Sequence, residues 1–378
     1  MKILFTGGET GGHFYPIIAV VQSLREQAKA RKILMPTLYY MAPSKYNPRA
    51  LFDNELEYIY VPAGKIRRYF SVLNITDAFK TALGCATAVI KLFSIYPDVV
   101  FGKGGFGSFP ALFAARLLRI PVVIHESDSQ PGRVNLWAGK FAKKIAVSYE
   151  SASKYFNTKN KDKIAFTGNP IRADIVTPLV NGAHEFLQLE LNTPTILILG
   201  GSQGSQTIND VMIQALPELL NRYQIIHQTG KKNLEEIKIT AGVVLKDHPY
   251  QYRYHPFDYL NDLAMRMSAG AADIVVSRAG STIFEIANWG KPSIIIPLPN
   301  SISHDQTANA FAYAETGAAS VIEENNMTSH ILIEEIDRIY NNLSIKQTMA
   351  QKAKDFSRPD SANIIAEAIL NIAVSHEK

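Results

Sequence analysis

The chain has 378 residues, of which 47% are hydrophobic and 19% are charged, which is typical of globular proteins and favours two domains over one. Its single cysteine, Cys85, excludes an internal disulfide framework and is typical of a reducing compartment. Residues 1–165 hold 23 Lys and Arg against 11 Asp and Glu (+12), and the remainder holds 16 against 23 (−7), which gives the net charge of +5. A basic first half indicates an anionic partner. We expect no nucleic acid, because no RNP, KH, zinc or helix-turn-helix pattern occurs.

Neither a membrane-spanning helix nor a signal peptide is predicted. No apolar run approaches the roughly 18 residues that a spanning helix needs, and the first apolar stretch stops at Thr6. We therefore expect a protein that stays in the cytoplasm.

The first predicted elements are a buried strand over residues 2–6, a glycine-rich turn over residues 7–12 and an amphipathic helix to about residue 28. Glycines let a ligand approach the backbone closely, and the amino terminus of a helix attracts anions. His13 lies at this positive end, so the pattern suits a phosphate-bearing or polar substrate. A tight turn with a surface histidine is the alternative. This first loop does not fit G-x-G-x-x-G, and no G-x-x-x-x-G-K-[ST] occurs in the chain, so neither a nicotinamide site nor a P-loop is supported.

Basic and aromatic side chains are mixed in the segment Lys65-Ile-Arg-Arg-Tyr-Phe70, and apolar residues follow up to Phe79. Apolar side chains can enter the headgroup region of a bilayer while Lys and Arg contact anionic lipid, at about 1 kcal/mol for each basic residue. The alternative is a helix whose aromatic side chains pack inward. The expected membrane patch comprises Lys65, Ile66, Arg67, Arg68, Tyr69, Phe70 and Phe79.

The design of strand, glycine loop and helix recurs three times. Apolar strands over residues 99–101, 196–199 and 274–277 each lead into a loop with glycine and then into a helical pattern. Two such junctions fall in each half of the chain. This predicts an α/β fold of two doubly wound, Rossmann-like domains, with ligands beyond the carboxyl ends of the strands. One long Rossmann-like domain whose extra glycines have no role is the alternative.

The domain boundary is predicted near Asn169-Pro170, because Asn-Pro favours a break. We therefore assign residues 1–166 to the first domain and residues 167–354 to the second. After a further break, a last helix over about residues 361–374 carries apolar residues at helical spacing.

Seven motifs, taken in order, resemble those of the N-acetylglucosaminyltransferase family of peptidoglycan synthesis (the MurG family) along nearly the whole chain. They lie at residues 7–13, 104–108, 125–132, 168–172, 200–204, 277–285 and 305–310. The resemblance implies the GT-B fold, in which two Rossmann-like domains flank a cleft, with segment 355–378 packing back on the first domain.

The resemblance also implies a reaction and its partners. N-acetylglucosamine would move, with inversion, from UDP-N-acetylglucosamine to the 4-hydroxyl of the undecaprenyl-diphosphate-linked muramyl pentapeptide, which converts lipid I to lipid II. The enzyme would be peripheral on the inner face of the cell membrane, against an anionic membrane surface.

In such a transferase the leaving group is a diphosphate, so negative charge develops on the β-phosphate. The backbone amides of residues 201–204 at a helix start, with the Ser202 hydroxyl, can stabilise it without a metal. No clear Asp-x-Asp pair occurs, so we expect no cofactor and no metal site, although a divalent cation can still affect the rate. The resemblance implies that Glu285 binds the ribose hydroxyls and that Arg172 contacts the nucleotide near uracil. Solvent exposure without a role is the alternative for both.

Further donor contacts are expected in the second domain. The backbone around Leu260 can pair with the uracil edge, and Gln306 and Asn309 would meet the hydroxyls of the donor sugar. The family often has two glutamines where this chain has Asp305-Gln306, and aspartate also accepts hydrogen bonds from hydroxyls. The expected donor-binding residues are Arg172, Gly201, Ser202, Gln203, Gly204, Leu260, Glu285, Asp305, Gln306 and Asn309.

The acceptor hydroxyl needs a base, and His13 is the leading candidate. A helix amino terminus disfavours the protonated imidazole, which keeps His13 able to accept a proton at neutral pH. A binding or turn role for His13 is the alternative, and His125 with Glu126 is the rival pair. The expected catalytic residues are His13 and Glu126. The expected acceptor-binding residues are Thr10, Gly11, Gly12, His13, Gly104, Gly105, Phe106, Ser108, His125 and Asp128.

Three other functions stay open at this point. A related GT-B lipid glycosyltransferase, such as a diacylglycerol sugar transferase, would use another acceptor. A UDP-N-acetylglucosamine 2-epimerase would isomerise the free UDP-sugar without an acceptor. A non-catalytic scaffold would bind the UDP-sugar and release no UDP.

Overall fold

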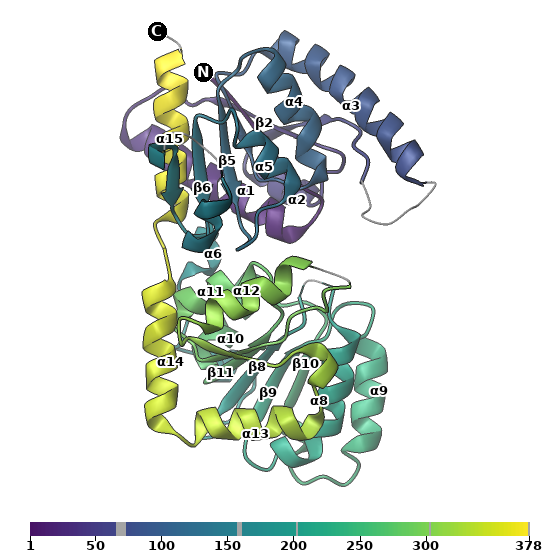
Figure 1. Cartoon of the computed structure of the whole chain (residues 1–378). Coiled ribbons are helices and arrows are strands. Elements are labelled where there is room, and N and C mark those ends of the chain that lie inside the picture. Colours follow the sequence, from purple (N-terminus) through teal and green to yellow (C-terminus); the bar gives the residue numbers. More distant parts are fainter. Residues whose placement is uncertain (66–72, 157–160, 202, 302–303, 377–378) are drawn as a thin grey trace. The chain divides into compact units, whose positions relative to one another are not determined.

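A computed structural model describes residues 1–65, 73–156, 161–201, 203–301 and 304–376 (Figure 1). The chain divides into two compact units, Met1–Arg172 with Arg358–Lys378, and Ala173–Ser357. The first unit extends past the predicted end at residue 166 because the carbonyl of Gly168 accepts hydrogen bonds from His125 Nε2 (3.0 Å) and Ser361 Oγ (2.8 Å). These bonds tie the Asn-Pro turn to the first unit.

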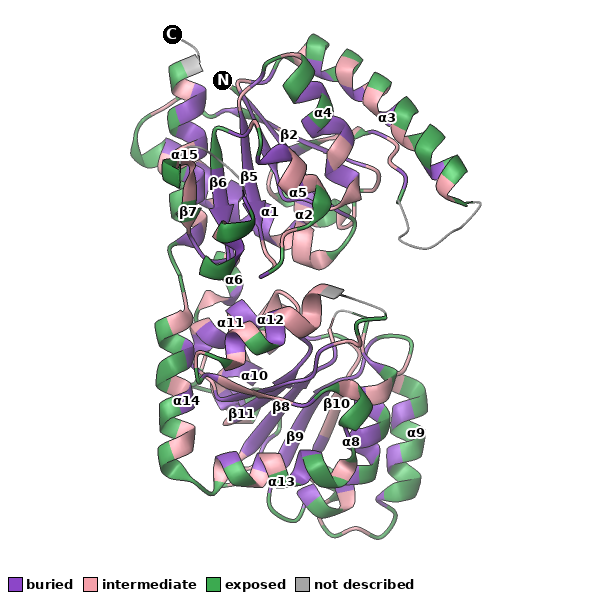
Figure 2. Cartoon of the chain, viewed as in Figure 1, coloured by how far each residue is buried: buried purple, intermediate pink, exposed green. Residues whose placement is uncertain are grey.

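Seven parallel strands form the sheet of the first unit, in the order β3-β2-β1-β4-β5-β6-β7. Their bounds are β1 (Lys2–Thr6), β2 (Thr37–Ala42), β3 (Leu56–Tyr60), β4 (Val99–Gly102), β5 (Val122–Glu126), β6 (Lys144–Val147) and β7 (Ile164–Phe166). The strand order reverses between β1 and β4. All residues of β4 and β5 are buried, and β5 is purple in Figure 2, as expected where helices cover both faces of a parallel sheet.

The helices of the first unit pack on this sheet. Their bounds are α1 (Gly11–Ala30), α2 (Pro48–Asp53), α3 (Leu73–Ile95), α4 (Phe109–Leu117), α5 (Arg133–Ala138) and α15 (Ser361–His376), with 3₁₀ turns η1 (Phe106–Ser108), η2 (Glu150–Tyr155) and η3 (Lys161–Lys163). The last helix, α15, lies beside α1, and Ile365, Ile369 and Leu370 share one buried core with Ile17 and Val21. The carboxy-terminal helix therefore does return to the first unit, as the resemblance implies.

Helix α3 is more apolar than the sequence indicated. Over 18 residues its mean hydropathy is sufficient for a membrane-spanning helix by length and composition (1.4), and only 17% of that window is buried. The prediction that no such stretch exists was wrong, because single Thr, Lys and Ser residues interrupt each apolar run without lowering the average. The helix packs against α4 through a narrow face, and most of its surface is exposed (Figure 2).

The second unit repeats the architecture with six parallel strands, in the order β10-β9-β8-β11-β12-β13. Its strands are β8 (Thr195–Leu199), β9 (Gln224–Gln228), β10 (Tyr254–Phe257), β11 (Ile274–Ser277), β12 (Ser293–Ile295) and β13 (Ala319–Val321). Its helices are α6 (Ala173–Val176), α7 (Ala183–Phe186), α8 (Gln206–Leu219), α9 (Leu234–Val244), α10 (Asp262–Ala271), α11 (Thr282–Trp289), α12 (His304–Ala314), α13 (Ser329–Tyr340) and α14 (Leu343–Phe356), with 3₁₀ turns η4 (Gln251–Arg253) and η5 (Glu324–Asn326).

Alternate residues of β8 enter two different cores. Ile196 and Ile198 pack with α8, α9 and α13, whereas Leu197 and Leu199 pack with α10, α11 and α12. A strand buried on both faces in this way is the mark of a doubly wound sheet. The prediction of two such domains is confirmed, and the alternative of one long domain is wrong.

Candidate functional site

The predicted glycine junctions stand at the two places where the strand order reverses. The loops after β1 and β4 flank the reversal in the first unit, and the loops after β8 and β11 flank it in the second. In open α/β sheets, ligands bind at such switch points, beyond the carboxyl ends of the strands. Each unit therefore offers one candidate site.

Two glycine loops close around the His13 imidazole in the first unit. A Cβ on Gly8 would lie 2.9 Å from His13 Nδ1, and a Cβ on Gly105 would lie 3.0 Å from the Gly8 Cα. Gly105 also has a φ of +75°, which favours glycine. The loops after β1 and β4 can pack this closely only because these positions lack side chains.

His13 is held by its neighbour across one turn of α1. Its Nδ1 lies 2.8 Å from the hydroxyl oxygen of Thr10. Burial, with a smaller effect from the charge of Lys103, lowers the pKa of His13 to about 4. The imidazole is therefore neutral at pH 7 and can accept a proton.

Lys103, which the sequence reasoning did not single out, stands between these loops at the end of β4. Its side chain is 1% exposed, and its Nζ has no hydrogen-bond partner among the described residues. Burial lowers its pKa to about 8, against the opposing effect of Glu126 and Asp128. The sequence pattern that could have identified Lys103 as a candidate site residue is a lysine within a glycine loop at the end of a strand.

The Glu126 carboxylate is occupied by donors from its own loop. Its Oε1 accepts from the amide of Asp128 (2.9 Å), and its Oε2 accepts from the amide of Gly132 (3.0 Å) and from Asn135 Nδ2 (2.9 Å). Burial, reinforced by Asp128, raises the pKa of Glu126 to about 7. The carboxylate shapes the loop between β5 and α5, which argues against the catalytic role predicted for it.

His125 is buried in the first unit. Its Nε2 donates to the carbonyl of Gly168 (3.0 Å) and lies 3.2 Å from the hydroxyl of Ser148. Burial lowers the pKa of His125 well below its usual value. The ring joins β5 to the turn before Arg172, so this geometry favours a structural role over the predicted contact with the acceptor.

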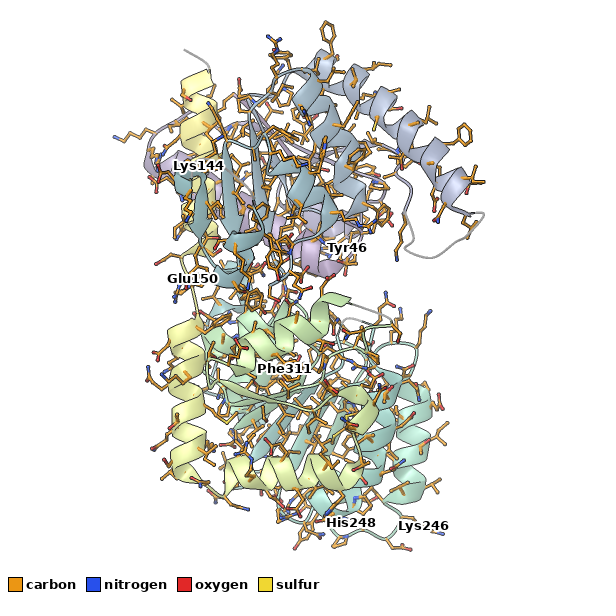
Figure 3. The ribbon with its side chains drawn as sticks, viewed as in Figure 1. Tyr46, Lys144, Glu150, Lys246, His248 and Phe311 are labelled. Carbon is orange, nitrogen blue, oxygen red and sulfur yellow. The ribbon has the colours of Figure 1, made fainter. Side chains whose placement is uncertain are left out.

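The remaining acceptor candidates lie on the same three loops, after the neighbouring strands β1, β4 and β5. Ser108 Oγ donates to the carbonyl of Gly105 (2.9 Å) and closes its own turn. A Cβ on Gly11 would lie 2.8 Å from the hydroxyl of Tyr46. Tyr46 is labelled in the first unit in Figure 3. The predicted residues Thr10, Gly11, Gly12, Gly104, Phe106 and Asp128 are thus brought to one edge of the sheet.

Arg172, predicted to contact the donor, belongs to the first unit. Its guanidinium carbon lies 4.3 Å from the ring centroid of Tyr15 on α1. A cation over an aromatic face is held more firmly than a solvated side chain. The structure therefore disfavours the alternative in which Arg172 is merely exposed to solvent.

In the second unit, the loop between β8 and α8 forms a tight turn. Gly201 and Gly204 have φ values of +91° and +77°, and the amide of Gly204 donates to the carbonyl of Gly201 (3.0 Å). The Gly204 amide is therefore used inside the turn, which argues against the predicted use of this amide as a phosphate donor. Gln203 is exposed in this turn, and Ser202 lies outside the described residues.

Arg278, which follows β11, contacts the residue that caps the start of α8. It donates to the carbonyls of Ile296 (3.2 Å) and Pro297 (3.4 Å) and to Ser205 Oγ, and it forms an ion pair with Glu324. Ser205 is the N-cap of α8, and its Oγ also accepts from the amide of Ile208. Burial lowers the pKa of Arg278, against the effect of Glu324.

The other donor candidates follow the carboxyl ends of β10, β11 and β12. Glu285 is half-buried in the first turn of α11, and Asn309 is buried on α12, where Asp305 is half-buried. Gln306 Oε1 accepts from the amide of Leu298 (3.1 Å). The amide of Leu260 donates to Gln228 Oε1 (3.0 Å), so only its carbonyl is left for a base edge. Sequence reasoning missed Gln228.

Most of the predicted membrane patch, from Ile66 to Phe70, lies outside the described residues. Of its other members, Lys65 is exposed and Phe79 on α3 is 74% exposed. The alternative in which the aromatic side chains pack inward is wrong for Phe79. Within the described part of the chain, no group of three or more His, Cys, Asp or Glu side chains is arranged to hold a metal ion.

Comparisons with known proteins cover both units. The glycosyltransferase family 28 N-terminal domain matches residues 3–147, and the glycosyltransferase family 28 C-terminal domain matches residues 195–365. The chain is similar to UDP-N-acetylglucosamine–N-acetylmuramyl-(pentapeptide) pyrophosphoryl-undecaprenol N-acetylglucosamine transferase 2 of Bacillus cereus. The two sequences are 36% identical over 354 residues, and this alignment covers 93% of this chain and 95% of the relative.

Two solved structures are also similar. The crystal structure of Acinetobacter baumannii MurG has a TM-score of 0.73 and 25% identity, covering 98% of this chain and all of that one. A UDP-GlcNAc 2-epimerase from Neisseria meningitidis, bound to UDP-GlcNAc, has a TM-score of 0.67 at 16% identity, over 98% of this chain and 100% of the epimerase. The second likeness concerns the fold alone.

Proposed function

Because the chain belongs to the family of the UDP-N-acetylglucosamine–N-acetylmuramyl-(pentapeptide) pyrophosphoryl-undecaprenol N-acetylglucosamine transferases, we propose that it transfers N-acetylglucosamine to the 4-hydroxyl of the lipid-linked muramyl pentapeptide. It is a UDP-N-acetylglucosamine-dependent glycosyltransferase of peptidoglycan synthesis. The observation that carries the proposal is an identity of 36% sustained over 93% of the chain, a span that includes most of both units.

We assign the diphosphate of UDP to the amino terminus of α8. The positive end of a helix and its unpaired amides favour anions, and the positive φ of Gly201 turns the backbone without steric cost. Glu285, Asp305, Gln306 and Asn309 follow neighbouring strand ends in the same unit, which supports their assignment to the ribose and the donor sugar.

We assign the general base to His13. The acceptor oxygen bonds to the anomeric carbon on the face opposite UDP, the bond from that carbon to the β-phosphate oxygen breaks, and UDP leaves with the electron pair. His13 Nε2 takes the hydroxyl proton. A pKa near 4 makes a weak base, so proton transfer is expected to accompany bond formation rather than to precede it.

We propose that the transfer needs no metal ion. Support comes from the α8 terminus, whose backbone dipoles can stabilise the charge that develops on the leaving diphosphate. A divalent cation can still alter the rate by binding the free nucleotide.

We propose that the protein is cytoplasmic and attaches to the inner face of the membrane through α3 and the basic segment before it. Ile75, Phe79, Leu83, Ile90 and Phe93 are exposed on α3 and recur at a spacing that places them on one face of the helix. Exposed apolar stripes of this kind are typical of membrane or protein contacts, and the charge of +12 on residues 1–165 favours anionic lipid.

The test is UDP release with a soluble analogue of the muramyl-diphosphoryl lipid, in the presence and absence of a chelator. We expect release that depends on this acceptor and continues with the chelator. Release with diacylglycerol only would instead identify a different lipid glycosyltransferase. Isomerisation of UDP-N-acetylglucosamine without an acceptor would identify an epimerase, and UDP-sugar binding without turnover would leave a scaffold.

A further inference from the structure

The side-chain amide of Gln228 joins two loops of the second unit. Gln228 is the last residue of β9 and is 3% exposed. Its Nε2 donates to the carbonyl of Gly201 (3.0 Å), and its Oε1 accepts from the amide of Leu260 (3.0 Å). One side chain therefore bonds to the turn before α8 and to the loop after β10.

The residues after Gln228 press against the same turn. The carbonyl of Thr229 accepts from Asn209 Nδ2 on α8 (3.1 Å) and from Asn233 Nδ2 (2.9 Å). A Cβ on Gly204 would collide with that carbonyl, and a Cβ on Gly230 would collide with the carbonyl of Gln203. The backbone after β9 thus packs directly against the glycine turn, and the hydrogen bond from Gln228 Nε2 holds the carbonyl of Gly201 in that turn.

We propose that Gln228 is a positioning residue that sets the spacing between the diphosphate-binding turn and the backbone at Leu260. A nucleoside diphosphate bound along these loops would have its phosphates at the turn and its base at Leu260, so their spacing must match the length of the ligand. A carboxamide suits this task, because it carries a donor and an acceptor at a fixed separation. The inference rests on the proposed donor site.

The two hydrogen bonds can be separated by substitution. In Gln228→Glu at pH 8, the carboxylate still accepts from the Leu260 amide, but it cannot donate and it repels the Gly201 carbonyl. In Gln228→Met, a side chain of similar length makes neither bond. The first variant should displace the turn and leave the Leu260 loop in place, whereas the second should release both.

Gln224 provides a matched control on the same strand. It is fully buried at the opposite end of β9 and donates to the carbonyls of Glu190 (2.9 Å) and Thr193 (2.8 Å) and to Thr195 Oγ1 (2.9 Å), while accepting from the amide of Glu190 (2.8 Å). Gln224→Glu makes the same chemical change to a buried amide, far from the carboxyl end of the strand. It should lower the melting temperature without changing nucleotide affinity.

The experiment measures UDP binding by titration calorimetry and uridine binding by displacement of UDP, at pH 8, with the full chain. We expect Gln228→Glu to weaken UDP by about tenfold, as for a lost hydrogen bond with added repulsion, while uridine affinity changes less than about twofold. Gln228→Met should weaken both ligands, and the donor KM should rise in both variants with a smaller change in kcat.

Several results would overturn the inference: wild-type UDP affinity in Gln228→Glu, equal losses for UDP and uridine in that variant, or a similar loss in Gln224→Glu. If Gln228→Glu does not fold, Gln228→Met decides, because unchanged affinity for both ligands also contradicts a positioning role. Failure of the unaltered protein to bind UDP would contradict the proposed function instead.

Discussion

The hydroxyl oxygen of Thr10 lies 2.8 Å from Nδ1 of His13. Thr10 is the N-cap of α1, yet its side chain makes no capping bond to the helix backbone. When Nδ1 carries the ring proton, it donates to Thr10 Oγ1, and Nε2 keeps the lone pair. The pair can therefore select the tautomer that a base at Nε2 requires.

Replacing Thr10 with Val should lower kcat by about tenfold, because the isosteric side chain removes a hydrogen bond that orients the base. His13→Ala should cost about 100-fold or more, as for loss of a general base. Steady-state kinetics with the soluble acceptor measures both, and Thr10→Ser is the control that should keep kcat. A Thr10→Val variant with full kcat would show that the hydroxyl does not orient the ring for catalysis.

Lys103→Met should move the acidic limb of the pH–rate profile to higher pH. Burial and the Lys103 charge lower the pKa of His13 to about 4, so removal of the charge leaves burial alone and raises this pKa. The profile of kcat/KM from pH 4 to 9 measures the limb, and Lys103→Arg should keep it in place. An unchanged limb would mean that another group sets it.

The same pKa predicts how stability depends on pH. Between about pH 4 and 6.5 the unfolded chain binds more protons at His13 than the folded chain does, so the free energy of unfolding decreases as the pH falls through this window. The stability that is lost in this window is fully present above pH 6.5. Denaturant titrations at several pH values measure the free energy of unfolding. Over that range it should change less steeply with pH in His13→Gln than in the unaltered protein.

The sequence predicted the two doubly wound sheets because local patterns carry them. Apolar strands followed by glycine turns need only neighbouring residues to be recognised, and these junctions mark both strand-order reversals. The position of His13 at a helix start was local information too. Contacts between segments that are distant in the sequence are not local information, which is why the roles of Gln228 and Arg278 were missed.

The roles of Glu126 and His125 show the limit of motif reasoning. Both residues lie in a polar motif at a strand end, where a catalytic role is a sound hypothesis. Their partners, the amide of Gly132 and the carbonyl of Gly168, depend on how the following loops fold back. A motif gives the residue type at an edge of the sheet, and only the fold shows which side chains are already occupied.

Removal of Arg278 should destabilise the second unit and weaken donor binding. Arg278→Met leaves the half-buried Glu324 without its partner and removes a hydrogen bond to Ser205, which should cost about 3 kcal/mol. Urea denaturation and UDP titration measure the two effects. The double variant Arg278→Met with Glu324→Leu should regain stability while UDP affinity stays low. Equal recovery of both would assign Arg278 to stability alone.

Gln306→Ala should raise the donor KM by about tenfold, because it removes the proposed sugar contact and leaves the Leu298 amide without the Oε1 acceptor of Gln306. Gln306→Glu keeps that acceptor and should preserve the loop, so it separates the structural bond from the sugar contact. If Gln306→Ala is destabilised but has an unchanged KM, the residue serves only to hold α12.

Charge introduced on the exposed stripe of α3 should release the protein from anionic vesicles. Phe79 and Phe93 are 74% and 70% exposed, and burying an aromatic side chain in the bilayer interface contributes about 1.5–3 kcal/mol. Phe79→Glu with Phe93→Glu should therefore reduce binding by more than tenfold in co-sedimentation with phosphatidylglycerol vesicles. Lys65→Glu with Arg67→Glu and Arg68→Glu should also reduce it, in a manner that depends on salt.

The matched control for this experiment lies on α9, where Ile239 and Val243 form a similar exposed apolar pair, 70% and 71% exposed, in the second unit. Ile239→Glu with Val243→Glu changes net charge as the α3 double variant does, so it corrects for general repulsion from anionic lipid. Its vesicle binding should be reduced only slightly. Equal losses from α3 and α9 would indicate a charge effect without a specific patch, and no loss from α3 would exclude that helix as the membrane contact.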